Sequence, residues 1–191
     1  MLTVLVIEES RSRAGEICAG LALAGYQVAA ILAGAENLTA EVEKLQPDVI
    51  LIDTDSPSRD TLEHLAAMNK NMPRPVVIFT QEDGQATIRD AVKAGVSAYI
   101  VDGLDPKRIK PIVEVARARF EDTQALRREL DEISQKLSDR KLVDKAKGVL
   151  MKARGIDEDA AYHAMRKLAM ERGQTMAKVA RDVIDMARVL L

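Results

Sequence analysis

Short apolar runs alternate with stretches of helical spacing over about the first 105 residues of the chain. The runs are continuously apolar, so both faces of each predicted strand must be buried. Strands of this kind that are separated by helices predict a parallel sheet covered by helices on both faces. The predicted strands are residues 3–7, 26–32, 48–52, 76–79 and 98–101, and the predicted helices between them are 12–24, 61–68 and 86–94.

A single long helix is predicted after the last strand. Pro111 suits its first turn, where a missing N–H costs little. From residue 112 to about 154 there is no other proline, and Gly148 is the only glycine. Four apolar residues follow a 4-3-4 spacing, which is typical of a short coiled-coil seam: Leu126, Leu130, Ile133 and Leu137. The alternative is a helix packed on its own domain, but we favour dimerisation because charged residues surround this narrow stripe.

Two shorter helices are predicted at the C-terminal end. Asp157 is a suitable N-cap for the first, Gly173 ends it, and Thr175 can cap the second, which extends to about residue 190. Together with the end of the long helix they predict a small three-helix bundle. The expected organisation is a five-stranded α/β domain (1–110), a coiled-coil linker helix (111–139) and a helical domain (140–191).

Composition and charge narrow the functional classes. The chain is 47% hydrophobic and 30% charged, no apolar run approaches the roughly 20 residues of a membrane span, and the opening residues lack a basic segment. With a single cysteine, Cys18, these features predict a cytoplasmic protein without internal disulfides or membrane partners. Residues 1–120 hold 13 Lys and Arg against 17 Asp and Glu (−4), whereas residues 139–191 hold 12 against 8 (+4). The basic end suits phosphate contacts.

Polar side chains stand at the carboxyl ends of the predicted strands, where parallel α/β folds place their chemistry. Glu8 and Glu9 follow the first strand, Asp53 ends the third, and Thr80 ends the fourth. This layout resembles the flavodoxin-like receiver domain of two-component response regulators over about residues 1–120. The resemblance implies that the acidic pair and Asp53 hold Mg²⁺, that Asp53 is the phosphoacceptor, and that Thr80 contacts the phosphoryl group.

The receiver resemblance breaks down after the fifth strand. The family has a lysine there, whereas this chain has Asp102, so the cation that would stabilise transferred charge is missing. Glutamates in place of aspartates also fit the tight octahedral geometry of Mg²⁺ poorly. We therefore expect Asp53 to be an ordinary polar residue, the domain to bind protein rather than catalyse a reaction, and no cofactor to be resident. Glu8, Glu9 and Asp53 remain the only candidate ligands if Mg²⁺ binds.

The C-terminal residues suit RNA. Candidate phosphate contacts are Lys145, Lys147 and Lys152 at the end of the long helix. Tyr162 and Arg166 share a face of the next helix, where a ring can stack on a base and a guanidinium can clamp phosphate. Tyr162 could instead be a partly buried bundle residue. Gly148 indicates close approach of another backbone, from RNA or from a neighbouring helix, and we favour the helix. The two histidines are isolated, so no metal is expected.

The segments 146–151, 161–166 and 169–170 resemble the ANTAR module, an RNA-binding domain of bacterial antiterminators, over roughly the last 50 residues. The resemblance implies binding to a pair of RNA hairpins near a terminator in a leader transcript. Segments 52–60, 97–101 and 117–120 are similar to NasT-type antiterminators of nitrate and nitrite assimilation. That likeness implies control by a nitrate-sensing partner protein.

Two alternatives of other classes remain. One is a DNA-binding response regulator that uses the terminal bundle as a helix-turn-helix, which would prefer symmetric duplex sites over hairpin loops. The other is a regulator that depends on phosphorylation of Asp53 and acts on RNA or DNA.

Overall fold

The computed structural model describes residues 1–190. They divide into two compact units, residues 1–124 and the described residues from 125 onward. Leu191, the last residue of the predicted helical domain, lies outside the described residues. The first unit therefore includes the opening turns of the long helix and extends beyond the predicted boundary at 110.

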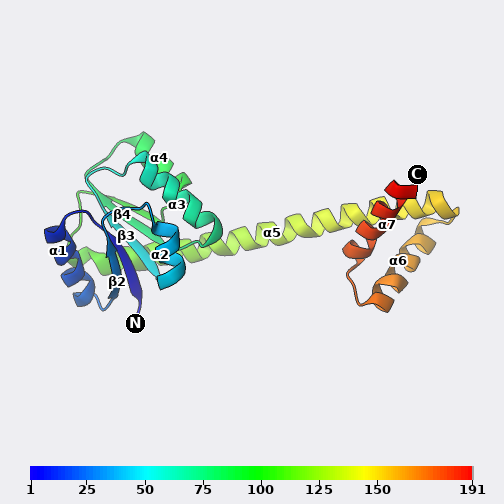
Figure 1. The fold of residues 1–191 in the computed structure, drawn as a ribbon, viewed down its shortest axis with the longest axis horizontal. Coiled ribbons are helices and arrows are strands. Elements are labelled where there is room, and N and C mark those ends of the chain that lie inside the picture. Colours follow the sequence, from blue (N-terminus) through cyan, green and yellow to red (C-terminus); the bar gives the residue numbers. More distant parts are fainter. Residues whose placement is uncertain (191) are drawn as a thin grey trace. The chain divides into compact units, whose positions relative to one another are not determined.

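Five parallel strands form the sheet of the first unit, in the order β2-β1-β3-β4-β5. Figure 1 labels β2, β3 and β4 of this sheet. They are β1 (Thr3–Ile7), β2 (Gln27–Leu32), β3 (Val49–Asp53), β4 (Val76–Thr80) and β5 (Ala98–Val101). The predicted five-stranded parallel sheet is confirmed, with strand boundaries that differ by one residue or less. The central strands β1, β3 and β4 are almost entirely buried, as continuous apolar runs require.

Helices cover both faces of this sheet. They are α1 (Arg11–Leu23), α2 (Leu38–Leu45), α3 (Arg59–Asn71) and α4 (Gln85–Lys93), followed by a 3₁₀ turn at Pro106–Arg108 and by α5 (Ile109–Arg154). Side chains of α2, α3 and α4 pack on one face around Ile50 and Ile78. Side chains of α1 and the start of α5 pack on the other face around Leu51 and Phe79. The predicted elements do not include α2.

The second unit is a three-helix bundle. The end of α5 packs with α6 (Glu158–Arg172) and α7 (Met176–Leu190) around a core that includes Ala146, Met165 and Val179. The Asp157 side chain accepts a hydrogen bond of 2.7 Å from the Ala160 amide at the start of α6, which satisfies a donor left free at a helix N-terminus. The predicted cap and the predicted bundle are thus confirmed.

The connection between α6 and α7 also follows the sequence prediction. Gly173 ends α6 in the left-handed conformation, with φ of 59°, which glycine adopts without steric cost. The Thr175 hydroxyl then accepts a hydrogen bond of 3.2 Å from the Lys178 amide at the start of α7.

Candidate functional site

The polar pocket of the first unit lies at the carboxyl ends of β1, β3 and β4. Glu8, Asp53 and Thr80 are 6%, 8% and 1% exposed, and they are its buried polar residues. The structure brings these three predicted residues together. Glu9 lies beside them but is exposed. A cavity of about 290 Å³ opens next to Asp53 and Thr80 and is also lined by Asp102 and Arg13.

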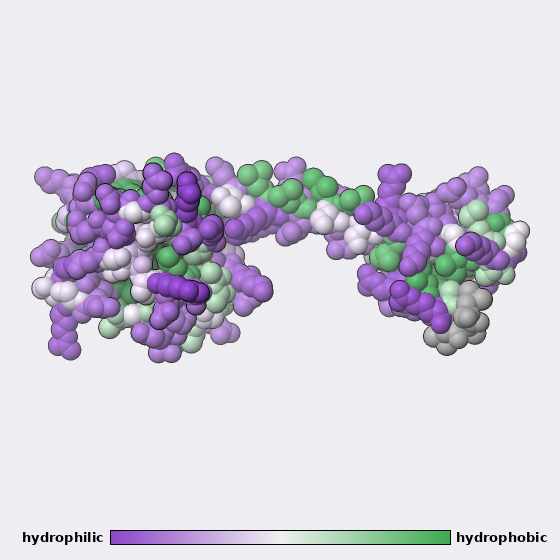
Figure 2. Space-filling model, turned by 90° about the horizontal axis from the view of Figure 1, so that it is seen from above, coloured by the Kyte–Doolittle hydropathy of each residue, from purple (hydrophilic) through white to green (hydrophobic). Residues whose placement is uncertain are grey.

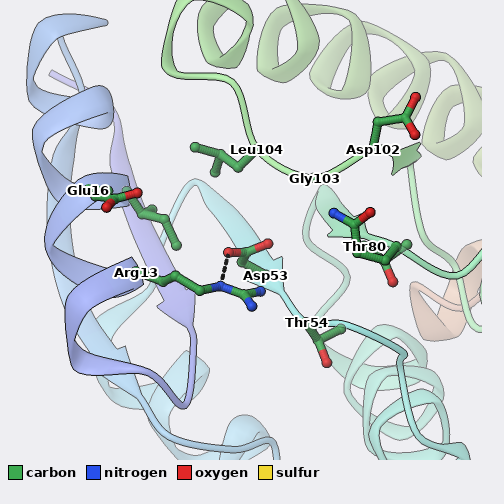
Figure 3. A pocket seen from close by; sticks show the side chains of 10 residues that line it. Arg13, Glu16, Asp53, Thr54, Thr80, Asp102, Gly103 and Leu104 are labelled. Atoms are coloured by element: carbon green, nitrogen blue, oxygen red, sulfur yellow. Dashed lines mark hydrogen bonds and ion pairs between the residues drawn. The ribbon is translucent and has the colours of Figure 1, made fainter.

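Arg13 is the residue of this pocket that the sequence analysis missed. It projects from the first turn of α1 toward Asp53 (Figure 3). Its Nε lies 3.2 Å from Asp53 Oδ2 and 3.4 Å from Glu8 Oε2, and its Nη1 lies 2.9 Å from Asp55 Oδ1. A signal was present in the sequence, because Arg13 follows closely after the acidic pair at the end of the first strand, where the chain enters the first helix.

The pocket raises the pKa values of both Glu8 and Arg13. Burial, followed by the neighbouring Asp53 carboxylate, raises the pKa of Glu8 above its usual value. Glu8 Oε1 accepts a hydrogen bond of 2.7 Å from the Ser10 amide, whereas Oε2 is buried without a hydrogen-bond partner in the described chain and faces the guanidinium. Hydrogen bonds to Asp55 and Asp53 raise the pKa of Arg13, which therefore stays charged.

The residues present do not fit a resident Mg²⁺. Mg²⁺ requires oxygen ligands at about 2.0–2.1 Å in octahedral geometry. The oxygens of Glu8 and Asp53 that would supply them face the Arg13 guanidinium instead. Among residues 1–190, no group of three or more His, Cys, Asp or Glu side chains is placed to hold a metal ion.

Hydrogen bonds within the chain use both sides of the Thr80 hydroxyl. It donates to the Asp55 carbonyl at 2.8 Å and accepts from the Glu82 amide at 3.2 Å. The Glu82 carbonyl in turn accepts a hydrogen bond of 3.0 Å from the Tyr99 hydroxyl on β5. A hydrogen-bonded chain therefore connects the loops after β3 and β4 with the last strand.

Asp102 follows β5 directly, at the rim of the cavity beside Asp53. Its backbone is left-handed, with φ of 74°, and its exposed side chain points away from Asp53 (Figure 3). This backbone turn carries the carboxylate toward solvent, so Asp102 adds no negative charge directly beside Asp53. The lysine of other receivers is nevertheless missing from this position.

The three lysines that the sequence predicts as phosphate contacts fall into two groups. Lys145 and Lys152 are exposed and make no ion pair among the described side chains. Lys147 is different, because its side chain is only 16% exposed and its Nζ lies 2.7 Å from Asp144 Oδ1 and 2.6 Å from Glu158 Oε1. These two carboxylates raise the pKa of Lys147. Lys147 therefore joins α5 to the start of α6 and is not a free phosphate contact in this structure.

The surface around Gly148 is open. A Cβ added at Gly148 would meet no other described side chain or neighbouring helix within 4 Å, so helix packing, which we favoured, does not explain this glycine. Tyr162 on α6 is 40% exposed and its ring stands edge-on to the His163 ring, 6.0 Å between centroids. Arg166 lies one turn further along and is also exposed.

The apolar seam of α5 is exposed in the single chain. Its members and their exposed fractions are Leu126 (62%), Leu130 (65%), Ile133 (55%) and Leu137 (54%). None of the four belongs to a hydrophobic core of the described residues. Figure 2 shows apolar side chains gathered along this stretch of the helix. The alternative that the seam packs on its own domain is therefore not observed.

Comparisons with known proteins agree with this architecture. Residues 4–114 match the response regulator receiver domain, and residues 131–184 match the ANTAR domain. The transcriptional regulatory protein PdtaR of Mycobacterium tuberculosis is 28% identical over 182 residues, which cover 95% of this chain and 89% of that protein. A nitrate regulatory protein of Klebsiella oxytoca is 36% identical over 75 residues, which cover 39% of this chain and 19% of that protein.

Solved structures show the same fold for the first unit. A CheY-like response regulator receiver domain protein from Methanospirillum hungatei matches with a TM-score of 0.56 and 19% identity, over 64% of this chain and 98% of that one. The chain therefore belongs to the response regulators in which a receiver domain is followed by an ANTAR domain, a class of transcription regulators. Within residues 1–190, none of the helices combines the length and apolar content that a membrane crossing requires.

Proposed function

We propose that this protein is a dimeric transcription antiterminator that binds hairpins of a leader RNA through its C-terminal bundle. The observation that carries the proposal is the ANTAR match over residues 131–184, together with the exposed Tyr162 and Arg166 on one face of α6. An exposed ring can stack on an unpaired base, and a guanidinium can bind phosphate or a base edge. Lys145, Lys152 and the open surface at Gly148 would contact the RNA backbone.

Dimerisation through the exposed seam of α5 supports this mode of binding. Two bundles joined by a coiled coil would bind two hairpins of one transcript, and the tether would increase the overall affinity. We propose that the regulated genes serve nitrate or nitrite assimilation. A nitrate-sensing partner protein, rather than phosphorylation, controls the release of this chain from that partner. The similarity to the Klebsiella nitrate regulatory protein supports the pathway, and the missing lysine together with the engaged Arg13 supports independence from phosphorylation.

Binding of a two-hairpin RNA to purified variants tests the RNA-binding face. Tyr162→Ala should weaken binding by about 1–3 kcal/mol if one base stacks on the ring, which is about 5- to 150-fold. It should also remove the preference for looped over fully paired RNA, whereas Tyr162→Phe should retain both. Arg166→Ala should weaken binding, whereas Lys167→Ala, which removes the same charge one position along the helix, should not. Equal binding by all four folded variants would place the RNA on another face of the bundle.

Gly148→Ala should change the stability of α5 and the affinity for RNA in opposite directions if RNA contacts this surface. Nothing in the described structure would meet the added methyl group, so the substitution should stabilise α5 by about 1 kcal/mol. If the RNA backbone approaches Gly148, binding should weaken while the melting temperature rises. Unchanged RNA affinity in this variant would show that Gly148 does not lie at the RNA surface.

A phosphorylation-dependent regulator is the second candidate, because the receiver match retains Asp53 and Thr80 at their strand ends. Mass spectrometry after treatment with acetyl phosphate distinguishes the two: the proposed function predicts no phosphoryl adduct on Asp53. A pull-down of endogenous partners with and without nitrate tests the partner. Recovery of the same proteins under both conditions would argue against nitrate control.

A further inference from the structure

One guanidinium contacts three carboxylates that come from different parts of the receiver unit. Glu8 follows β1, Asp53 ends β3, and Asp55 lies in the loop before α3. Arg13 directs Nε toward the first two and Nη1 toward the third, at 2.9–3.4 Å. Glu8 and Asp53 are almost fully buried, so their charges require a compensating cation within the pocket.

We propose that the Arg13 guanidinium is a built-in cation that takes the place of a divalent metal in this pocket. A metal would need the same oxygens of Glu8 and Asp53 at about 2.0–2.1 Å, and the guanidinium already faces them. Metal and arginine therefore compete for one position. Because the arginine is covalently part of α1, its effective concentration at the carboxylates is high, and added Mg²⁺ binds weakly.

The position of Arg13 also fixes the neighbouring loops. The Asp55 carboxylate binds the guanidinium, while the Asp55 carbonyl accepts hydrogen bonds from the Thr80 hydroxyl at 2.8 Å and the Gln81 amide at 3.2 Å. Arg13 thus holds the loop after β3 against the loop after β4. All of these contacts are made by groups of the chain itself, so the receiver unit keeps one arrangement of these loops whatever the metal concentration. This inference concerns the receiver pocket alone and does not depend on the RNA-binding proposal.

Arg13→Met tests the inference, because methionine keeps an unbranched apolar stem and removes the charge. Titration of the full chain with MgCl₂ by calorimetry should give no measurable binding for the unsubstituted protein at millimolar concentration. Arg13→Met should bind one Mg²⁺ at least about tenfold more tightly, and its melting temperature should rise with added Mg²⁺. Hydrogen exchange of residues 54–58 should accelerate in this variant without metal and slow again when Mg²⁺ is added.

Two control variants identify the position of the ion. Arg11→Met removes an exposed charge from the same turn of α1 and should behave like the unsubstituted protein. Arg13→Met with Asp53→Asn removes a metal ligand as well, and the Mg²⁺ response should disappear.

Several outcomes decide against the inference. Mg²⁺ binding by the unsubstituted protein as tight as that of Arg13→Met would overturn it, as would a folded Arg13→Met variant that ignores Mg²⁺. Should Arg13→Met be unfolded without metal, Mg²⁺ is expected to restore its circular dichroism spectrum. Failure of that rescue at concentrations that do not precipitate the protein would equally overturn the inference.

Discussion

The exposed seam of α5 makes the dimer proposal quantitatively testable through Leu130→Asp combined with Leu137→Asp. Leu130 and Leu137 are 65% and 54% exposed in the single chain, and their spacing places them at the same position of successive heptads. The double substitution puts two carboxylates per chain at the centre of the predicted interface. A buried, unpaired charge is costly, so association should weaken strongly.

The expected effect follows from the area that a partner would cover. Complete burial of a leucine or isoleucine side chain contributes about 1.5–3 kcal/mol, and somewhat more than half of each seam side chain is still exposed. Burial of the remainder would contribute about 1–2 kcal/mol for each side chain. Two chains bring four such side chains each, about 8–16 kcal/mol together, against an association cost of about 4–15 kcal/mol. We therefore expect a concentration-dependent dimer.

Loss of Leu130 and Leu137 from both chains removes about 4–8 kcal/mol of the association free energy. The dimer dissociation constant should therefore rise about a thousandfold or more. Sedimentation velocity over about 1–100 μM protein should show dimer for the unsubstituted chain and monomer for the variant. Arg128→Asp with Gln135→Asp is the matched control, because both positions lie on the outer face of the same heptads and should leave the dimer intact. A double variant as dimeric as the unsubstituted protein would locate the interface elsewhere.

Two further predictions concern the receiver pocket. Asp53→Asn should leave antitermination and partner release nearly unchanged, because the pocket lacks the lysine that stabilises a phosphoryl group; loss of induction in a folded variant, measured with a leader-terminator reporter, would contradict this. The pKa of Glu8 is raised in the folded chain, so folding favours the protonated carboxyl relative to the unfolded chain. The stability that this group contributes is therefore present below its usual pKa of 4.5 and is lost as the pH rises through the raised pKa. Glu8→Gln should remove this part of the pH dependence and raise the melting temperature at about pH 7 relative to the unsubstituted protein; a variant that is less stable at that pH would show that the ionised form is the one the fold requires.

Elements with local signals could be predicted from the amino-acid sequence. Continuous apolar runs specified the five strands, because only a sheet covered on both faces buries them. The cap at Asp157 and the left-handed turn at Gly173 also follow from local chemistry, since the side-chain oxygen and the missing Cβ act within a few residues. The signal for α2 was present in the helical spacing of Leu38, Val42 and Leu45, but the prediction omitted it.

The partners of the charged side chains depend on the folded structure and could not be predicted from the sequence. Arg13 and Asp53 are 40 residues apart, and only the parallel sheet brings the start of α1 over the end of β3. The sequence alone predicts the same role in RNA binding for Lys145 and Lys147. In the folded chain, however, the turn before α6 brings Glu158 back to Lys147. Gly148 was expected to meet a neighbouring helix, but no other described helix comes within 4 Å of a Cβ added there. Local patterns specify helices and strands because backbone geometry is local, whereas electrostatic partners depend on distances that exist only after the chain has folded.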